Sequence, residues 1–236
     1  MTGGQCIHDL VPDASPPPAN EAIVTSGAGT VVLRQVAPWL TPDGRLEKRT
    51  CLTHSVVSSA AEVSYSFLML SMLLIRLAKV AMIGSLAVYA FIVAYDNLVD
   101  YGSNYQFVRH VLSMDTTFPG NALMHRAVIN ESIWRVAYAL IIAMEGLTAL
   151  LLALGAVMLL GRLRAPAEIF NRSKVWAIAG LTVGFALWFF GFMVIAGEYF
   201  AMWQSKEWNG QEAAFRITTV ILAVLIFVSL PDGDVG

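Results

Sequence analysis

Long apolar runs separated by short polar segments make up the chain after residue 63. The runs cover residues 80–95, extended toward 99, and then 136–161, 175–197 and 213–230. About 20 helical residues, each rising about 1.5 Å, are needed to cross a hydrocarbon core of about 30 Å. Each run is close to that length, so the pattern predicts an all-α integral membrane protein with a bundle of four transmembrane helices. The apolar stretch 65–75 is expected to be an interfacial or lengthening turn before the first helix.

The first 63 residues differ from the rest of the chain. Six of the nine prolines fall within the first 42 residues, and no apolar period is sustained there. We therefore expect two parts, a disordered or weakly ordered tail over 1–63 and a four-span transmembrane domain over 64–236. An alternative is that the biological start lies at Met69 or Met72, which would leave part of the tail outside the protein.

The composition supports membrane insertion and argues against a nucleic-acid partner. Hydrophobic residues make up 57% of the chain and charged residues 14%, with a mean hydropathy of +0.64. Soluble domains average about 45–50% apolar and about 25% charged residues. The formal net charge of −2 leaves no basic excess for binding a phosphate backbone. The lipid bilayer, and not nucleic acid, is the expected partner.

Cysteines and histidines are too few, and lie too far outside the apolar runs, to predict a cofactor site. Cys6 and Cys51 lie in the N-terminal segment, and none of the four histidines lies in an apolar run, so the bundle lacks the histidine pair of an intramembrane haem. His110 and His125 could bind a metal with Asp100 or Asp115, but the spacings match no known site. We expect no metal and no cofactor.

Basic residues in the short loops predict the orientation, because cytoplasmic loops are enriched in Lys and Arg. Arg76 and Lys79 flank the first run, and four basic residues lie between the second and third runs: Arg162, Arg164, Arg172 and Lys174. We therefore expect both termini in the cytoplasm and the protein in the inner (cytoplasmic) membrane. Segments 96–135 and 198–216 are expected on the outer side.

The first outer segment is expected to contain a short helix that lies on the membrane surface. Ser103 and Gln106 match a capping box. Four apolar residues fall on one face of the helix that this box would start: Phe107, Val108, Val111 and Leu112. Asn130 is the expected cap of the second transmembrane helix.

Aromatic and amide side chains in the two outer segments are open to two interpretations. Trp and Tyr form interfacial belts in membrane proteins of every function. Alternatively, the two segments pack together into a surface for a polar ligand or a partner protein. The candidate residues for such a surface are Asp100, Asn104, Arg109, His110, Asp115, Glu198, Trp203, Gln204, Trp208, Asn209 and Gln211.

Glu145 is the only charged residue inside the second apolar run, about 13 Å below its outer boundary at about 1.5 Å per residue. An ionisable group at that depth costs on the order of 3 kcal/mol and indicates a functional site by default. Tyr89 and Trp188 lie at comparable depth and could donate hydrogen bonds to it. Glu145 is either a protonated carboxylic acid that joins helices or a site of proton coupling or ligand binding.

Small residues on one face of the third run predict a close helix contact. Gly180 and Gly184 form a small-xxx-small pair, and Gly191 continues the same face. Such a face lets the backbone of another helix approach closely. That helix belongs either to the same bundle or to a second copy in a homo-oligomer.

Three segments resemble a bacterial family known as predicted small integral membrane proteins, a domain of unknown function. They are RLAKV from Arg76, DYGSNYQFVRHVLSMDTTFPGN from Asp100 and GEYFAMWQSKEWNGQEAAFR from Gly197. The resemblance covers about two-thirds of the chain and leaves the first ~70 residues outside it. It implies a small cytoplasmic-membrane protein of several spans, and it transfers no activity and no catalytic residue.

Three functions remain open at this point. The first is a non-catalytic accessory or assembly subunit of a membrane complex, which docks a membrane-protein partner through its outer loops. The second is a small transporter or proton-coupled carrier that uses Glu145. The third is an enzyme acting on a lipid or quinone, with Asp115, Glu198 or His110 as acid or base. No HExxH, nucleophile elbow or Walker motif supports an enzyme, so the subunit is expected first.

Overall fold

The computed structural model of the chain describes residues 5–8, 33–40, 43, 46–53 and 57–234. The chain divides into two compact units, Met1–Leu68 and Met69–Gly236, and each is described by itself.

The first unit contains an antiparallel sheet that the apolar pattern did not indicate. Its strands are β1 (Gln5–His8), β2 (Leu33–Leu40) and β3 (Leu46–Thr53). β3 lies between the other two in the order β1-β3-β2. Many residues of the predicted tail lie outside the described ones, so the expectation of a weakly ordered segment over 1–63 stays a prediction.

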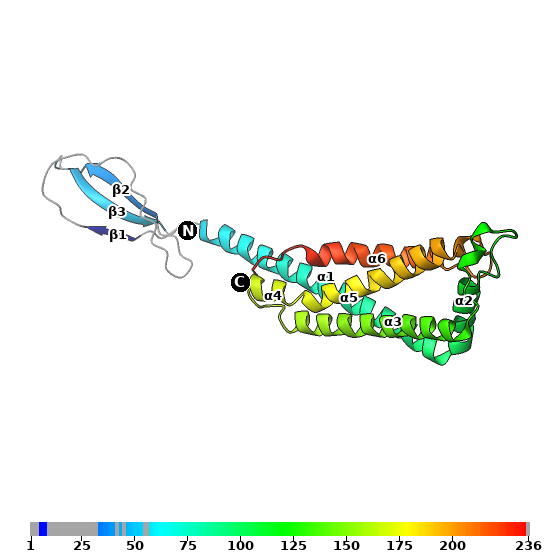
Figure 1. The fold of residues 1–236 in the computed structure, drawn as a ribbon. Helices are drawn as coiled ribbons and strands as arrows, with labels where there is room; N and C mark the ends of the chain where they lie inside the picture. The colour runs from blue at the N-terminus through cyan, green and yellow to red at the C-terminus, as the bar shows by residue number, and fades with distance from the viewer. Residues whose placement is uncertain (1–4, 9–32, 41–42, 44–45, 54–56, 235–236) are drawn as a thin grey trace. The chain divides into compact units, whose positions relative to one another are not determined.

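The described residues contain four helical spans that are long and apolar enough to cross a membrane, as predicted. The first is α1 (Val57–Val99), of which the span covers Ser64–Val99. The others are α3 (Glu131–Leu160), α5 (Val175–Phe185), which runs on as the π-helical stretch η2 (Ala186–Tyr199), and α6 (Gln211–Ser229). Figure 1 shows the four spans running alongside one another. The predicted all-α membrane bundle is confirmed.

Local sequence explains several helix ends. The side chain of Asn130 accepts a hydrogen bond from the backbone N–H of Ser132 at 2.9 Å, which satisfies one free donor at the start of α3. The predicted cap is therefore confirmed. α6 ends two residues before Pro231, which has no N–H to continue the helical ladder. Between α3 and α5, the short helix α4 (Ala167–Arg172) begins directly after Pro166.

The expected short helix after the first span is α2 (Tyr101–Ser113), and Figure 1 shows it crossing the end of the bundle. Val108 and Val111 are buried, as the apolar stripe predicted. The capping box is not formed, because the Ser103 hydroxyl donates to the Asp100 carboxylate at 3.0 Å and the helix already begins at Tyr101. Two short 3₁₀ turns, η1 (Ala122–Arg126) and η3 (Met202–Gln204), complete this end. We call it the α2 end.

Glycines bring α3 and α5 into close contact within the bundle. A Cβ atom on Gly180 would lie 2.9 Å from the backbone nitrogen of Leu152, and one on Gly184 would lie 3.1 Å from the Thr148 side chain. The backbones of α3 and α5 come closest at Gly155, which the sequence analysis did not single out. Gly191 departs from the expected face, because the nearest atom to its Cβ position belongs to Leu187 of its own helix.

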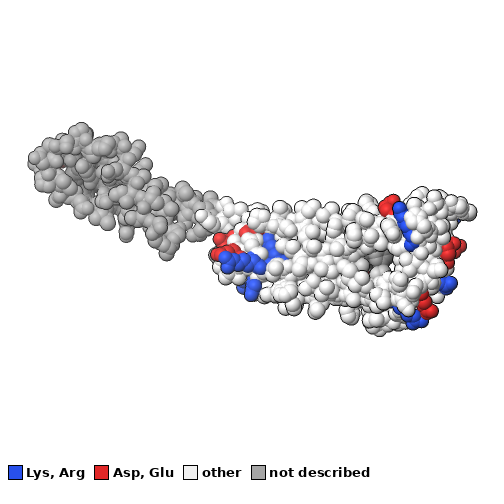
Figure 2. Space-filling model, viewed as in Figure 1, with Lys and Arg blue, Asp and Glu red and all other residues white. Residues whose placement is uncertain are grey.

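Charged side chains gather at the two ends of the second unit. Figure 2 shows them near α4 and the C-terminus and again at the α2 end, with a surface of uncharged residues between. Large apolar side chains on that surface are exposed, including Phe91 at 61% and Val157 at 69%. An apolar belt between polar ends is what a helical bundle in a bilayer requires, because lipid tails contact it directly.

Candidate functional site

A cavity of about 230 Å³ lies where α2 crosses the ends of the spans. Figure 2 shows the surface hollowed near the α2 end. Four elements line the cavity, namely the last turns of α1, the middle of α2, the α2-side half of α3 and η2. The lining residues are Val93, Asn97, Asn104, Phe107, Val108, Tyr138, Ile141, Glu145, Trp188 and Phe192.

Glu145 lies in this cavity within a chain of buried hydrogen bonds. Its side-chain oxygen Oε2 accepts a bond of 2.7 Å from the amide nitrogen of Asn97. The Tyr138 hydroxyl donates to the backbone oxygen of Asn97 at 2.9 Å and to its amide oxygen at 3.3 Å. The shorter bond, to the backbone oxygen, ties Tyr138 to the last turns of α1 beside the Asn97 side chain.

The second oxygen of Glu145, Oε1, forms no hydrogen bond with any described residue. Glu145 as a whole is only 2% exposed. Its unpartnered Oε1 is nevertheless not fully enclosed by protein atoms. None of the residues that line the cavity is basic. The carboxyl group therefore lines the cavity with one neutral protein donor and with a second oxygen that has no hydrogen-bond partner among the described residues.

The donor expected for Glu145 differs from the one that the structure shows. Trp188 lines the cavity, whereas Tyr89 packs against Trp188 with ring centroids 6.0 Å apart and is 40% exposed. Neither donates to Glu145. Sequence analysis missed Asn97, although the residue lies in the stretch 96–99 by which the first run was extended. The available signal was an uncharged amide in that stretch.

The two loops at the α2 end pack together, in line with the second interpretation of their aromatic and amide residues. The Gln204 side-chain oxygen accepts hydrogen bonds from the Phe118 backbone and from the Asn121 amide, each at 3.1 Å. The Thr116 hydroxyl donates to the Ser205 hydroxyl at 2.9 Å. A small apolar core lies beneath these bonds, formed by Val111, Met114, Phe200, Ala201 and Met202.

His110, Asp115 and Trp208 form one cluster on these loops. Nδ1 of His110 lies 2.9 Å from the carboxylate oxygens of Asp115, and its ring stacks on Trp208 with centroids 4.7 Å apart. In the part of the chain that the structure describes, no group of three or more His, Cys, Asp or Glu residues could hold a metal ion. The cluster therefore joins α2 to the second loop as a hydrogen-bonded and stacked contact.

The candidates on α2 are spread around the helix. Asp100 accepts the hydroxyl of Ser103 at its start. Arg109 donates to Gln106 at 3.0 Å and lies 5.7 Å from the centre of the Trp134 ring. These contacts link neighbouring turns of α2 and link α2 to α3. Only Asn104 among the candidates on α2 and its flanks reaches the cavity.

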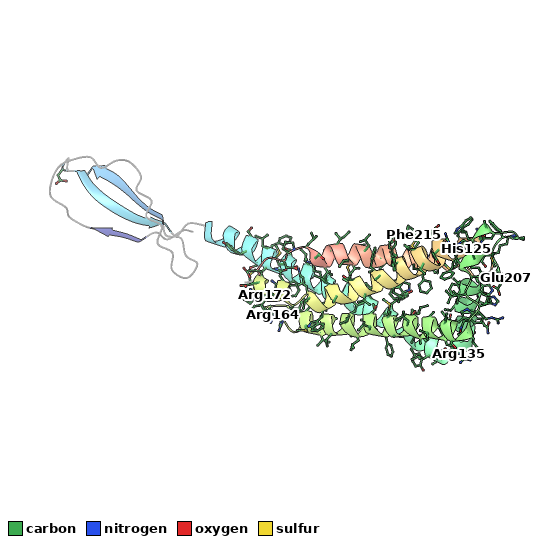
Figure 3. All side chains as sticks on the ribbon, viewed as in Figure 1. His125, Arg135, Arg164, Arg172, Glu207 and Phe215 are labelled. Atoms are coloured by element: carbon green, nitrogen blue, oxygen red, sulfur yellow. The ribbon has the colours of Figure 1, made fainter. Side chains whose placement is uncertain are left out.

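The candidates on the second loop likewise lie outside the cavity. Trp203 packs edge-on against Phe118, with centroids 5.8 Å apart. The side chain of Asn209 accepts from the Gln211 backbone at 3.1 Å, at the start of α6. Glu198 is exposed. Figure 3 shows Glu207, which belongs to the second loop, at the α2 end of the bundle. The surface formed by the two packed loops and the intramembrane cavity are therefore two different places in the structure.

A second cluster of charges lies at the opposite end, which we call the C-terminal end. Asp232 accepts from Lys79 at 2.7 Å and from Lys174 at 2.5 Å, and all three side chains are at most 4% exposed. The backbone oxygen of Leu230 accepts from both lysines, at 2.8 and 2.7 Å. Sequence analysis used the lysines only for orientation and did not pair them with Asp232, because the contact joins residues far apart in the chain.

Arg76 extends this cluster and is itself fully buried. Its guanidinium donates to the backbone oxygens of Leu163 and Ala165, both at 2.7 Å, and to that of Gly233 at 2.6 Å. It also lies 4.4 Å from the centre of the Phe170 ring. The C-terminal segment is therefore fastened across the end of the bundle. Figure 3 shows Arg164 and Arg172 at this same end.

Four apolar spans, an uncharged belt and a buried carboxyl group define the chain as a polytopic helical integral membrane protein. The family model described as predicted small integral membrane protein (DUF2165) matches residues 75–231. The chain therefore belongs to this family, which confirms the resemblance noted from its sequence. No curated protein and no solved structure matches the chain.

Proposed function

We propose that the protein is a small carrier that binds its cargo at Glu145. The observation that carries this proposal is the buried Glu145 carboxyl group, which lines a cavity of about 230 Å³ and accepts a hydrogen bond at only one of its two oxygens. An ionisable group in a membrane span costs on the order of 3 kcal/mol, and such groups occur mainly at sites of transport or ligand binding. A carboxyl group kept there without a basic partner is available to a proton or to a cargo molecule.

The difference between the two ends of the bundle also supports a carrier. A carrier exposes its binding site to one side of the membrane at a time. Here the cavity lies beside α2, and the exposed Asn104 is on its lining. The C-terminal end is closed by the buried contacts of Arg76, Lys79 and Lys174. This arrangement corresponds to a state that is open beside α2 and closed at the C-terminal end.

The orientation that fits this proposal places the C-terminal end in the cytoplasm and the protein in the inner membrane, with both termini inside. Six basic residues at or near the C-terminal end support it, because cytoplasmic loops are enriched in Lys and Arg. These are Arg76, Lys79, Arg162, Arg164, Arg172 and Lys174.

Cysteine labelling in intact cells tests this orientation, with Cys6 and Cys51 first replaced by serine. Glu207 and Arg164 are both exposed and lie at opposite ends of the bundle. We expect Glu207→Cys to react with a membrane-impermeant maleimide and Arg164→Cys to react only after the cells are permeabilised. The reverse pattern would place the cavity on the cytoplasmic side.

The substitution Glu145→Gln tests the carrier itself. The protein is reconstituted in vesicles that enclose a pH-sensitive dye, and a panel of small solutes is added across a pH gradient. We expect at least one solute to drive proton movement through the unchanged protein. Glu145→Gln should slow it about tenfold or more, because a hydrogen bond to a charged group contributes about 1.5–3 kcal/mol.

Glu168→Gln is the matched control for this experiment. Glu168 lies on α4, its side chain is 73% exposed, and it pairs only with Arg172 in the next turn. Its replacement should leave the rate unchanged. Equal rates for Glu145→Gln and the unchanged protein would remove the basis of the proposal.

A second candidate function is an accessory subunit that docks a membrane-protein partner or another copy of itself. The observation that favours it is the pair Phe118 and Trp203 on the joined loops, which are 52% and 48% exposed. Aromatic residues are enriched in protein interfaces. Native mass spectrometry of the gently extracted protein separates the two functions, because a subunit should retain a stoichiometric partner chain.

A further inference from the structure

We propose that the ligand of the Glu145 cavity is a small organic cation, an amine or quaternary ammonium compound held by the carboxylate and by the surrounding aromatic rings. This inference rests on the proposed carrier function and names the class of its cargo. It is drawn from the charge, the ring content and the size of the cavity.

The charge of the cavity favours a cation over an anion or a neutral molecule. Glu145 is the one ionisable acid or base on the lining apart from the phenol of Tyr138, and no Lys, Arg or His accompanies it. Opposite charges attract more strongly in a site with little water than in bulk solvent. A bound cation would gain this attraction, an anion would be repelled by the carboxylate, and a neutral ligand would leave the charge uncompensated.

Aromatic rings supply the second part of the argument. Phe107, Tyr138, Trp188 and Phe192 all line the cavity. The rings of Phe107 and Phe192 are nearly parallel, with an interplanar angle of 26° and centroids 6.4 Å apart. A cation within about 6 Å of the face of such a ring is attracted to it, and aromatic cages are a recurrent means of binding quaternary ammonium groups.

The size and donor set of the cavity favour an organic cation over a bare metal ion. Drug-sized ligands occupy pockets of about 300–1,000 Å³, and this cavity of about 230 Å³ is somewhat smaller. A hard metal ion such as Ca²⁺ takes about six to eight oxygen ligands. The lining offers one carboxylate, the amides of Asn97 and Asn104 and one phenol, and most of it is apolar.

Ligand binding to the purified full-length chain in lipid nanodiscs tests this inference. The probes are choline, tetramethylammonium and butylammonium, and the control ligand is 3,3-dimethylbutan-1-ol, the neutral carbon analogue of choline. Isothermal titration calorimetry should show binding of at least one cation. The neutral analogue should bind about tenfold or more weakly, because it lacks both the charge pairing and the attraction to the rings.

Two variants on η2 provide a matched pair for the role of the rings. Phe192→Leu removes a ring from the cavity and should weaken binding of the cation by several-fold. Phe190→Leu, two residues away, changes a ring that is 58% exposed and does not line the cavity, and it should leave binding unchanged. Glu145→Gln should reduce the difference between choline and its neutral analogue to the part that the aromatic rings contribute. Glu145→Asp keeps the charge and should keep that difference, which covers the case in which Glu145→Gln does not fold.

The outcomes separate this inference from the proposed function. Equal binding of choline and the neutral analogue, or no binding of any of the three cations, overturns the cation assignment. The carrier proposal survives that result if Glu145→Gln still slows solute-driven proton movement in vesicles. If that substitution has no effect in vesicles, the carrier proposal fails, whatever the calorimetry shows.

Discussion

Replacing Asp232 by alanine is expected to destabilise the protein by about 3–5 kcal/mol, the cost of breaking a buried ion pair on one side. Asp232 is the carboxylate shared by Lys79 and Lys174, and both lysine side chains are almost fully buried. Without it, two ammonium groups remain in the interior with only backbone and amide oxygens as partners. Unfolding of the purified protein in detergent, followed by tryptophan fluorescence, measures the loss.

Asp234→Ala is the matched control for Asp232→Ala. Asp234 also bonds at the C-terminal end, to the backbone N–H of Ala167 at 2.6 Å, but it is exposed. Its replacement should cost about 1 kcal/mol or less. Replacing the buried group as a whole, with Lys79→Met, Lys174→Met and Asp232→Leu together, should recover much of the loss, because an apolar replacement of a buried ion cluster is often neutral. A single variant Asp232→Ala as stable as Asp234→Ala would contradict the expectation.

The Asp232 cluster also bears on the proposed mechanism. It fastens the segment after α6 to α1 and to the start of α5, at the end opposite the cavity. A carrier must open this end at some stage, and the buried ion pairs set the energy needed to do so. We therefore expect the stability of this cluster to limit how often the end opens.

Hydropathy predicts the spans of this protein well, because a bilayer of fixed thickness demands apolar helices of a fixed length. The same argument singled out Glu145, since a lone charge inside an apolar run is costly. It did not single out Asn97 in the extension of the first run, because an uncharged amide there carries no charge to stand out. Nor could it identify Asp232 as a partner of Lys79, because that contact depends on how helices distant in the sequence pack together.

The prediction that Gly180, Gly184 and Gly191 share one face of the third span is wrong at Gly191, where the helix geometry changes. Gly180 and Gly184 lie in α5, where the α-helical period holds, and both lie against α3. Gly191 lies in η2, which begins at Ala186 and has the wider π-helical turn. The phase of the helix therefore shifts, and positions counted at α-helical steps no longer share one face. The same stretch carries Trp188 and Phe192, which line the cavity.

The helix contact at Gly155 was missed for a different reason. A small residue in an apolar run is common, and only the partner helix shows which one matters. Here the partner is Ala177, the residue on α5 that lies directly against Gly155. Sequence alone pointed to the glycines of α5 and left the matching position on α3 unidentified.

Gly155→Ala is expected to destabilise the bundle by about 1–3 kcal/mol, the usual cost of adding atoms to a well-packed core. The new Cβ atom would lie 2.6 Å from the backbone nitrogen of Ala177 and 2.7 Å from its Cα. These are main-chain atoms that cannot rotate aside, so α3 and α5 must move apart. Unfolding in the detergent used for Asp232→Ala measures the effect.

Gly146→Ala isolates the contribution of the neighbouring helix. Gly146 lies in the same helix, and its Cβ position has no atom within 4 Å. Alanine there should leave stability unchanged or raise it by up to about 1 kcal/mol, because alanine is the better helix former. Both variants add the same methyl group to α3, so the difference between them measures the contact with Ala177. If Gly155→Ala proved as stable as Gly146→Ala, α3 and α5 could not lie as close as the structure places them.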